Sequence, residues 1–305
     1  MAIGDQIAAT QYNSIRNKAL DVLGSGSGNR GYGQTIQSSP VFTGNIITKA
    51  QWDALRYDIL NIKIHQDGVT PSLVEVPSGR PIEYGAGHPN TNFDFVMDGA
   101  INNRFNIGTG QSILSTKATR TFTSNWSSSA TTDLTVTFST AADARYFFNS
   151  GGKIRFTSTR IGGSATSQNN SWTNTLSQAG TQSFGANTPL NINFYTLTNS
   201  FVVFYQLNNS TPYSSNYYQL AVKCDIANNA TGGATVLTFR ITWEDAYVDP
   251  DIVSGFVAGT NPPTGVVDGT LSLEVEEIKA SGSLQPTGSF SILSPIYSLA
   301  TISAT

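Results

Sequence analysis

Charged, sulfur-containing and imidazole side chains are scarce in this sequence of 305 residues. Only 12% of the residues are charged, and the chain has one cysteine, Cys224, and two histidines, His65 and His88. A single cysteine excludes an internal disulfide and a multi-cysteine zinc site. Its place in an alternating segment predicts a small buried apolar side chain. Two histidines leave few candidates for the base of a serine or cysteine triad.

The charge balance and the lack of long apolar runs argue against two classes of partner. The net charge is -3 and the pI is near 5.3, so we expect no basic surface for a phosphate backbone and no nucleic acid partner. No run approaches the roughly eighteen apolar residues of a membrane helix, so we expect no membrane insertion. The amino terminus MAIGDQIAAT lacks the basic and apolar regions of a secretory signal, which predicts synthesis in a cytoplasm.

A duplicated phrase of helical character opens the chain. Residues 4–16 read GDQIAATQYNSIR, and residues 44–56 read GNIITKAQWDALR. Each copy has one apolar face at helical spacing, and two helices of about four turns cannot bury such faces alone. We therefore expect the helices to pack on each other, on strands or on another copy of the chain, and we predict an assembly interface formed by Tyr12, Ile15, Trp52, Leu55, Ile59 and Ile62.

The organisation of the chain predicts an α+β protein that is mainly β. Residues 1–68 form the duplicated helical docking and oligomerisation module, which contains a flexible Gly/Ser linker at 24–43. Residues 69–112 are an irregular connector. Residues 113–305 form an antiparallel β-sandwich of jelly-roll type. One short helix with Thr140 as its N-cap interrupts the strands.

Alternation of apolar and polar residues predicts the strands of the sandwich. Hairpin loops are predicted at NSGGK (149–153) and NNATGGA (228–234). The predicted strand segments are DLTVTF, KIRFTS, FVVFYQL, YYQLAVKC, ATVLTFRITW, LSLEVEEI and SFSIL.

Sequence motifs of catalysis and cofactor binding do not form a coherent set. A GxGxxG match at residues 26–31 follows a helix and leads to no βαβ unit, so it indicates a linker and not a nucleotide site. No phosphate loop, HExxH helix or GxSxG elbow is present. We predict no catalytic residue, cofactor or metal. At His65, imidazoles of several copies could converge on a metal, although a solvated helix end is the preferred interpretation.

Acidic and aromatic side chains are the remaining candidates. A cluster of acids at residues 244–277 has no basic neighbour between residues 241 and 278, and we interpret it as a solvated loop rim and charged strand edges instead of a calcium site. They are Glu244, Asp245, Asp249, Asp251, Asp268, Glu274, Glu276 and Glu277. In the polar loop NNSTPYSSNYY, three rings are candidate receptor contacts, namely Tyr213, Tyr217 and Tyr218.

Several phrases together resemble virion structural proteins of tailed bacteriophages, most of all those of myoviruses, including phages of cyanobacteria. They are the duplicated phrase, SGSGNRGYGQ, HQDG, INNRFNIGTGQ at 101–111, ARYFFNSGGKIRF at 144–156 and LTFRITWEDAY at 237–247. The resemblance implies a non-enzymatic part of a virus particle, such as a tail, baseplate or neck fibre. It implies copies of the chain itself, with a trimer favoured, and other virion proteins as partners.

Three functions follow from these observations as hypotheses. The first is a structural virion component that assembles through its amino-terminal helices. The second is a receptor- or glycan-binding tail fibre module that uses the tyrosines of the polar loop. The third and least favoured is a polysaccharide depolymerase that uses paired carboxylates such as Glu244 and Asp251.

Overall fold

The computed structural model describes residues 7–73, 75, 92–187, 192–247 and 265–304. The chain divides into two compact units. Unit 1 comprises Met1–Ile113, Thr140–Lys153 and Ile278–Ser294. Unit 2 comprises Leu114–Ser139, Ile154–Glu277 and Pro295–Thr305.

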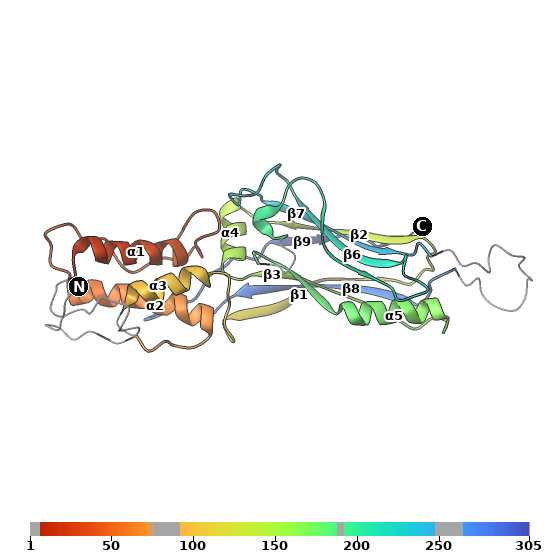
Figure 1. Cartoon of the computed structure of the whole chain (residues 1–305), viewed down its shortest axis with the longest axis horizontal. Helices are drawn as coiled ribbons and strands as arrows, with labels where there is room; N and C mark the ends of the chain where they lie inside the picture. Colours follow the sequence, from red (N-terminus) through yellow and green to blue (C-terminus); the bar gives the residue numbers. More distant parts are fainter. Residues whose placement is uncertain (1–6, 74, 76–91, 188–191, 248–264, 305) are drawn as a thin grey trace, which may run out of the picture. The chain divides into compact units, whose positions relative to one another are not determined.

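Unit 1 is built on three helices that run in the same direction, α1 (Ala9–Leu23), α2 (Lys49–Asp67) and α3 (Phe93–Asn102), together with the short helix α4 (Ala141–Asn149). Rings near the starts of the first three helices contact each other: Tyr12 lies 6.3 Å from Trp52, and Trp52 stacks on Phe93 at 4.6 Å. Near their ends, the Gln66 side chain of α2 donates to the Ala100 carbonyl of α3 at 2.9 Å. Figure 1 shows these three helices side by side.

Side chains of α1 and α2 hold an extended segment that follows α1. The Asn13 amide donates to the Val41 carbonyl at 2.7 Å and accepts from the Val41 N–H at 2.9 Å. The Asp58 carboxylate accepts from the N–H groups of Gln37 and Ser38 at 2.8 and 3.0 Å. The connector at 24–43, predicted to be a flexible linker, is therefore tied to the helices by its backbone.

The carboxy-terminal segment of unit 1 is held in the same way. Asn61 donates to the Gln285 carbonyl and accepts from the Gln285 N–H, at 3.1 and 2.6 Å. Gln34 makes the equivalent pair of bonds with Ser291, both at 3.0 Å. Phe290 stacks on the His65 ring at 4.4 Å. These contacts join residues that are more than two hundred positions apart in the sequence.

Unit 2 contains two antiparallel sheets and the helix α5 (Ser167–Ala179). A four-stranded sheet has the order β1-β8-β3-β4, and a six-stranded sheet has the order β10-β2-β7-β6-β5, with β9 also pairing with β2. The bounds are β1 Ser112–Phe122, β2 Ser129–Thr137, β3 Lys153–Ile161, β4 Thr181–Phe184, β5 Val202–Asn208, β6 Tyr217–Cys224, β7 Val236–Glu244, β8 Thr270–Ala280, β9 Ile296–Leu299 and β10 Ser303–Ala304. A short 3-10 turn covers Phe194–Thr196.

Aromatic side chains from both sheets form the core of unit 2. Phe156 of β3 lies 5.0 Å from Phe239 of β7, and Phe184 of β4 lies 5.4 Å from Phe204 of β5. Alternation explains why Phe156 and Phe239 face inward, since every second residue of β3 and of β7 is buried and these two rings lie at buried positions. Burial of large rings between the sheets supplies much of the stabilisation of this unit.

The coarse fold prediction is confirmed, since the chain is mixed α and β, mainly β, with two antiparallel sheets. Thr140 is the N-cap of α4, as predicted, and its side chain accepts from the Asp143 N–H. All predicted strand segments lie in strands except SFSIL at 289–293. That segment alternates, but its backbone bonds to Gln34 and its Phe290 packs in unit 1, so the strand prediction was wrong there.

Other local predictions differ from the structure. The NNATGGA loop joins the antiparallel neighbours β6 and β7, but NSGGK connects α4 to β3 and forms no hairpin. α3 lies inside the segment predicted as an irregular connector, and α5 lies inside the segment predicted as strands with only one helix. Residues 140–153 and 278–294, placed by the sequence in the β domain, belong to unit 1.

Candidate functional site

The six residues predicted as an assembly interface all lie in the interior of unit 1. Their exposed fractions are between 0 and 3%. Tyr12 donates from its hydroxyl to the Gln51 carbonyl at 3.0 Å, and Trp52 is covered by the ring of Phe93. The apolar faces of the two helices are thus covered by each other and by α3. An effect of these residues on assembly stays a prediction, and it would act through the fold of unit 1 because their side chains do not reach its surface.

The surface of unit 1 instead exposes apolar side chains that the sequence analysis did not single out. Phe42 is 75% exposed and Ile46 is 87% exposed. They flank a tight turn in which the Asn45 N–H donates to the Phe42 carbonyl at 3.0 Å, and Gly44 supplies the positive φ of 89° that this turn requires. We call residues 42–46 the apolar turn. The sequence did contain a signal for this exposed turn, since two bulky apolar residues flank the turn-forming residues Thr-Gly-Asn.

The three tyrosines predicted as receptor contacts have different environments. Tyr218 is fully buried and stacks on Trp243 at 6.0 Å, so it cannot contact a receptor in this fold. Tyr213 and Tyr217 are partly exposed, and the Tyr213 ring packs edge-on against Tyr247 at 4.7 Å. Only these two members of the set present surface on unit 2.

His65 lies in the interior of unit 1, which overturns both interpretations of it as an exposed helix end and as a metal ligand on a symmetry axis. The side chain is 1% exposed, and its Nε2 lies 2.9 Å from the Ser150 carbonyl. The ring stacks on Phe290 and meets the edge of Tyr32 at 5.0 Å. Burial lowers the pKa of His65 to about 4, and the hydrogen bond to Ser150 partly opposes this shift. His88 lies outside the described residues.

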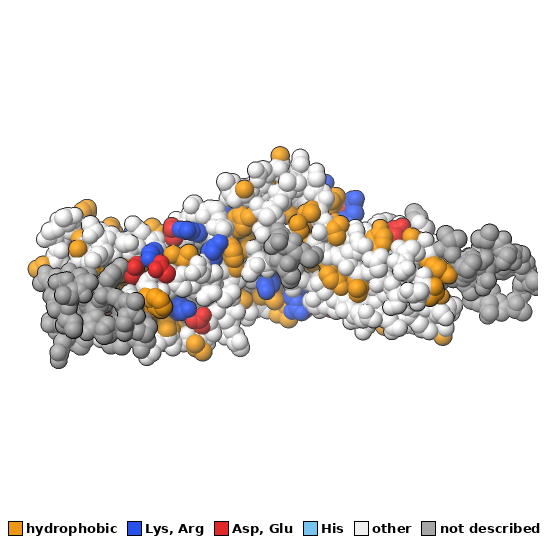
Figure 2. Space-filling view, in the orientation of Figure 1, with side chains coloured by type: hydrophobic (Ala, Val, Ile, Leu, Met, Phe, Trp, Pro, Cys, Tyr) orange, Lys and Arg blue, Asp and Glu red, His pale blue; other side chains and the backbone are white. Residues whose placement is uncertain are grey.

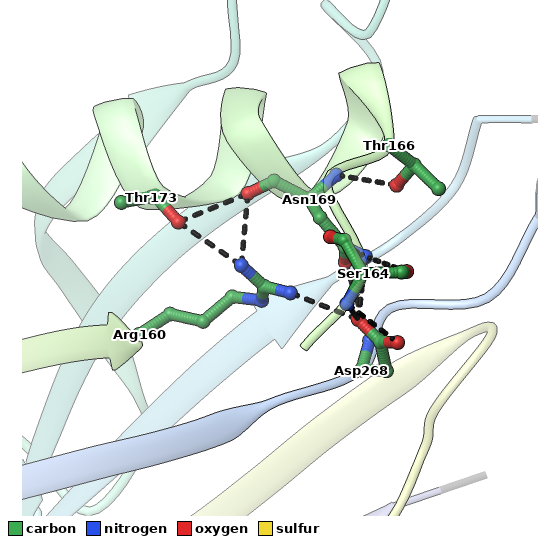
Figure 3. Close-up of polar contacts among 6 residues, drawn as sticks. All are labelled: Arg160, Ser164, Thr166, Asn169, Thr173 and Asp268. Carbon is green, nitrogen blue, oxygen red and sulfur yellow. Dashed lines mark hydrogen bonds and ion pairs between the residues drawn. The ribbon is translucent and has the colours of Figure 1, made fainter. Parts of the chain in front are cut away.

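Asp268, one of the acids interpreted as a solvated rim, belongs to a network of hydrogen bonds at α5 (Figure 3). Arg160 donates to the Asp268 carboxylate and to the Thr173 hydroxyl, each at 3.0 Å, and to the Asn169 carbonyl at 3.2 Å. The carboxylate also accepts from the Ser164 N–H and from the Asn169 side chain. Burial raises the pKa of Asp268, but the bonds from Ser164, the Arg160 charge and the Asn169 amide outweigh it, so the net pKa is lowered. The network fixes α5 against β3 and the start of β8.

Asp245, which directly follows β7, is the centre of a second polar network that also includes side chains of α5. Its carboxylate is 3% exposed and accepts from Gln168 Nε2 at 2.8 and 2.7 Å, from Trp172 Nε1 at 3.3 Å and from the Asn216 side chain. Burial raises the pKa of Asp245, and the bonds from Gln168, Trp172 and Asn216 oppose the increase. These contacts join α5, β7 and the loop before β6.

Three further acids of the predicted rim, Glu274, Glu276 and Glu277, also make contacts within unit 2. Glu277 is 1% exposed and lies 3.3 Å from Lys117, while the Tyr297 hydroxyl donates to it at 2.8 Å. The basic partners of these acids, such as Lys117, lie outside residues 241–278, so the sequence of that segment alone did not indicate ion pairs. Glu276 pairs with Arg155, Glu274 accepts from Thr116, Glu244 is partly exposed, and Asp249 and Asp251 lie outside the described residues.

Other predicted site features serve the fold or are not found. The GxGxxG loop is held by Asn149, whose side chain donates to the carbonyls of Gly28 and Gly31 at 3.3 and 3.2 Å. Cys224 is 3% exposed and unpaired in a disulfide, which confirms its predicted burial. In the described part of the chain, no three His, Cys, Asp or Glu side chains converge in a way that could hold a metal ion. No helix of that part is long and apolar enough to cross a membrane.

Comparison with known proteins gives no relative: no family model, no curated protein and no solved structure matches the chain.

Proposed function

We propose that this protein is a structural component of a tailed-bacteriophage virion, in the tail, baseplate or neck, and that it assembles through its amino-terminal unit. The apolar turn is the observation that carries the proposal. Phe42 and Ile46 stand almost fully exposed on a unit whose helices are closely packed inside. Large apolar side chains in such a position are stabilised when a partner removes them from water.

We propose a non-enzymatic role, in which the candidate site residues stabilise the fold. The acids and the histidine that stand out in the sequence are engaged in bonds that hold elements together, as Asp245 and Asp268 do around α5. A scaffold with polar contacts of this kind inside both units is suited to a particle component that must keep one conformation.

We also propose a finer description of the fold. Unit 2 is a β-sandwich of jelly-roll type, because rings from the two sheets contact each other across its interior. α1 and α2 are a duplicated helical module, because both helices begin with an extended N-cap residue, Ala8 or Thr48, to whose N–H the side chain of Gln11 or Gln51 returns as an acceptor.

The proposed partners are further copies of this chain and other virion proteins, and the proposed location is the virion. The resemblance to fibre components favours a trimer. The apolar turn, and not the buried helix faces, is the part of unit 1 that we expect to contact these partners.

Light scattering of the full chain tests the proposal. The double variant Phe42→Ser with Ile46→Ser removes two apolar contacts, and we expect it to weaken self-association at least about tenfold. The matched control is Ile161→Ser, which removes an apolar side chain that is 67% exposed in unit 2 and should leave the mass unchanged. An unchanged oligomer for the double variant would contradict the proposal, as would a monomeric wild-type chain.

A receptor- or glycan-binding module is the second candidate, favoured by the partial exposure of Tyr213 and Tyr217 on unit 2. Rings of this kind stack on sugar faces. Binding of the purified chain to host surface fractions, with and without Tyr213→Ala and Tyr217→Ala, tests it. Binding that both variants lose, at unchanged mass, supports the module, and no binding to any fraction rejects it.

A further inference from the structure

Three polar groups in the interior of unit 2 have no hydrogen-bond partner among the described residues. They are the Ser158 hydroxyl of β3, the Tyr218 hydroxyl of β6 and the Trp243 indole N–H of β7. The exposed fractions of the three side chains are between 0 and 2%. Buried polar groups without a partner destabilise a folded state and are rare in native proteins, so each of the three needs a physical explanation.

The three groups come together from both sheets. Tyr218 and Trp243 are directly opposite each other in the six-stranded sheet, and their rings stack at 6.0 Å. Ser158 belongs to the four-stranded sheet, at one of the buried positions of β3. Burial raises the pKa of Tyr218 and the Ser158 hydroxyl opposes this increase, so the two hydroxyls are close neighbours. They nevertheless do not bond to each other directly, and a third molecule can bridge hydroxyls in this arrangement.

The chemistry of the three groups favours water as the bridging molecule. The indole N–H only donates, whereas each hydroxyl both donates and accepts, and water can satisfy both kinds of group. None of the three groups is charged, which gives no preference for an ion. The buried charged side chains near the ends of β3 and β7, Arg160 and Asp245, are bonded to α5. Figure 2 also shows no red or blue group on the surface at the place of α5.

We propose that unit 2 has an internal water-binding site, in which ordered water bridges the hydroxyls of Ser158 and Tyr218 and accepts from the indole N–H of Trp243. Buried water typically makes about three hydrogen bonds to polar groups that have no other partner, which agrees with this set of one donor and two hydroxyls. The bridge would bond β3 of one sheet to β6 and β7 of the other, in a core that is otherwise held together by rings. This site is separate from the apolar turn and does not depend on the proposed function.

Magnetic relaxation dispersion of the water oxygen tests the site, because it counts the water molecules that stay inside a protein for a long time. The double variant Ser158→Ala with Tyr218→Phe removes both hydroxyls from the full chain with little change of shape, and it should hold at least one long-lived water molecule fewer than wild type. The matched control is Ser150→Ala with Tyr12→Phe, whose buried hydroxyls donate to backbone carbonyls of unit 1. This control should keep the wild-type number.

Urea unfolding of the single variants gives a second measurement. Ser158→Ala and Tyr218→Phe should each increase the unfolding equilibrium constant about tenfold, and the double variant should increase it by less than the product of the two, because either substitution alone breaks the bridge. Single variants that are more stable than wild type would overturn the proposal, since removal of an unbonded hydroxyl has that effect. An unchanged number of long-lived water molecules in the double variant would also overturn it and would assign any coupling to a direct bond between the hydroxyls. If a variant does not fold, a high-resolution crystal structure of the unaltered chain decides: density for water within hydrogen-bond distance of both hydroxyls supports the site, and its absence overturns it.

Discussion

Buried polar side chains connect distant parts of the chain one contact at a time. His65 brings α2 to Ser150 and Phe290, which belong to the two later segments of unit 1. Asp245 brings together the end of β7, α5 and the loop before β6. A buried polar group that loses its partner costs about 1–3 kcal/mol, so these two residues are where single substitutions and pH are expected to act.

His65→Phe should make the stability of unit 1 less sensitive to acid. The pKa of His65 is about 4 in the folded chain and about 6.5 when unfolded, so the unfolded state binds the proton first as the pH falls. The stability is present above about pH 6.5 and is lost as the pH falls towards 4, by about 3 kcal/mol. Urea unfolding of both chains between about pH 7 and pH 4 measures the difference, and equal losses in the two chains would show that His65 titrates freely.

Asp245→Asn and Asp245→Ala should differ strongly. Burial raises the pKa of this carboxyl, so its stabilising effect is complete below its unfolded pKa and is lost as the pH rises through the folded value. At neutral pH the asparagine, which keeps an acceptor for Gln168 or Asn216 without the charge, should unfold within about 1 kcal/mol of wild type. The alanine leaves three donors without their acceptor and should cost about 3 kcal/mol.

Thermal and urea unfolding at neutral pH compare the two Asp245 variants. If the asparagine is as damaging as the alanine, the three donors need both carboxylate oxygens of Asp245, and one amide oxygen does not replace them.

For single residues, the sequence predicted burial well where an element has one clearly apolar face. It predicted burial less well near the end of a strand, where the first residue of the strand has to be known before a side chain can be assigned to the inner or the outer face. Cys224 and the helix residues such as Trp52 are buried as their spacing indicates. Tyr217 and Tyr218 were counted both with the polar loop and at the start of the predicted strand YYQLAVKC, and β6 does begin at Tyr217, so the Tyr217 ring is partly exposed and the Tyr218 ring is buried. A shift of one residue in the start of a strand reverses this assignment.

Among the elements, α1 and α2 share an N-terminal geometry that only α2 uses fully. Thr48 and Ala8 have the same extended backbone, and Gln51 and Gln11 return to the backbone N–H of each. The Thr48 hydroxyl also accepts from the Gln51 N–H at 3.3 Å, whereas alanine has no acceptor for the corresponding bond.

Ala8→Thr should therefore stabilise unit 1 by about 1 kcal/mol, because it supplies the missing half of the capping box. Urea unfolding measures the gain. The matched variant Ala8→Val has nearly the same shape as Thr without the hydroxyl, and a gain of equal size from valine would assign the effect to packing instead of capping.

α5 depends on side-chain bonds, and a pair of neighbouring asparagines tests this dependence. The Asn169 side chain bonds to Ser164 and Asp268, whereas Asn170 is exposed. Asn169→Ala should cost about 2–3 kcal/mol through the loss of buried bonds, and Asn170→Ala should be neutral or slightly stabilising, because alanine favours a helix. Circular dichroism melting of both variants measures the contrast, and equal melting temperatures would show that the network in Figure 3 does not stabilise α5.

The same comparison explains why one helix was predicted and the other was not. α4 has a Thr140 cap and residues such as Ala141 and Arg145 that favour helices. α5 reads SQNNSWTNTLSQA, and its Ser, Asn and Thr residues favour turns in isolation. α5 also has a threonine N-cap, Thr166, whose side chain accepts from the Asn169 N–H, and the sequence analysis missed this local signal. The carboxylates that bond to Gln168 and Asn169 belong to Asp245 and Asp268, 77 and 99 residues away in the sequence, so no local pattern could reveal these contacts.

For the whole molecule, the two units are formed by segments that return from distant parts of the chain. The change from helical to alternating periodicity predicts the position where the strands begin, but not that residues 140–153 and 278–294 complete unit 1. Their contacts are made largely by backbone groups, as at Gln285 and Ser291, and backbone recognition leaves no pattern in the sequence. The sequence left open whether the apolar helix faces pack on each other, on strands or on another copy, and the rings of Tyr12, Trp52 and Phe93 show that the helices pack on one another.

Phe290→Ala tests whether the late segment completes unit 1 in solution. The ring is 7% exposed and stacks on His65, so its removal should destabilise unit 1 by about 3 kcal/mol through lost contacts and a cavity. Hydrogen exchange followed by mass spectrometry should then show faster exchange in α2 and α4 and unchanged exchange in β6 and β7. Phe239→Ala, in the core of unit 2, should produce the opposite pattern. Equal acceleration of both units by either variant would mean that the units unfold as one cooperative structure, because contacts confined to one unit cannot change the opening of an independent one.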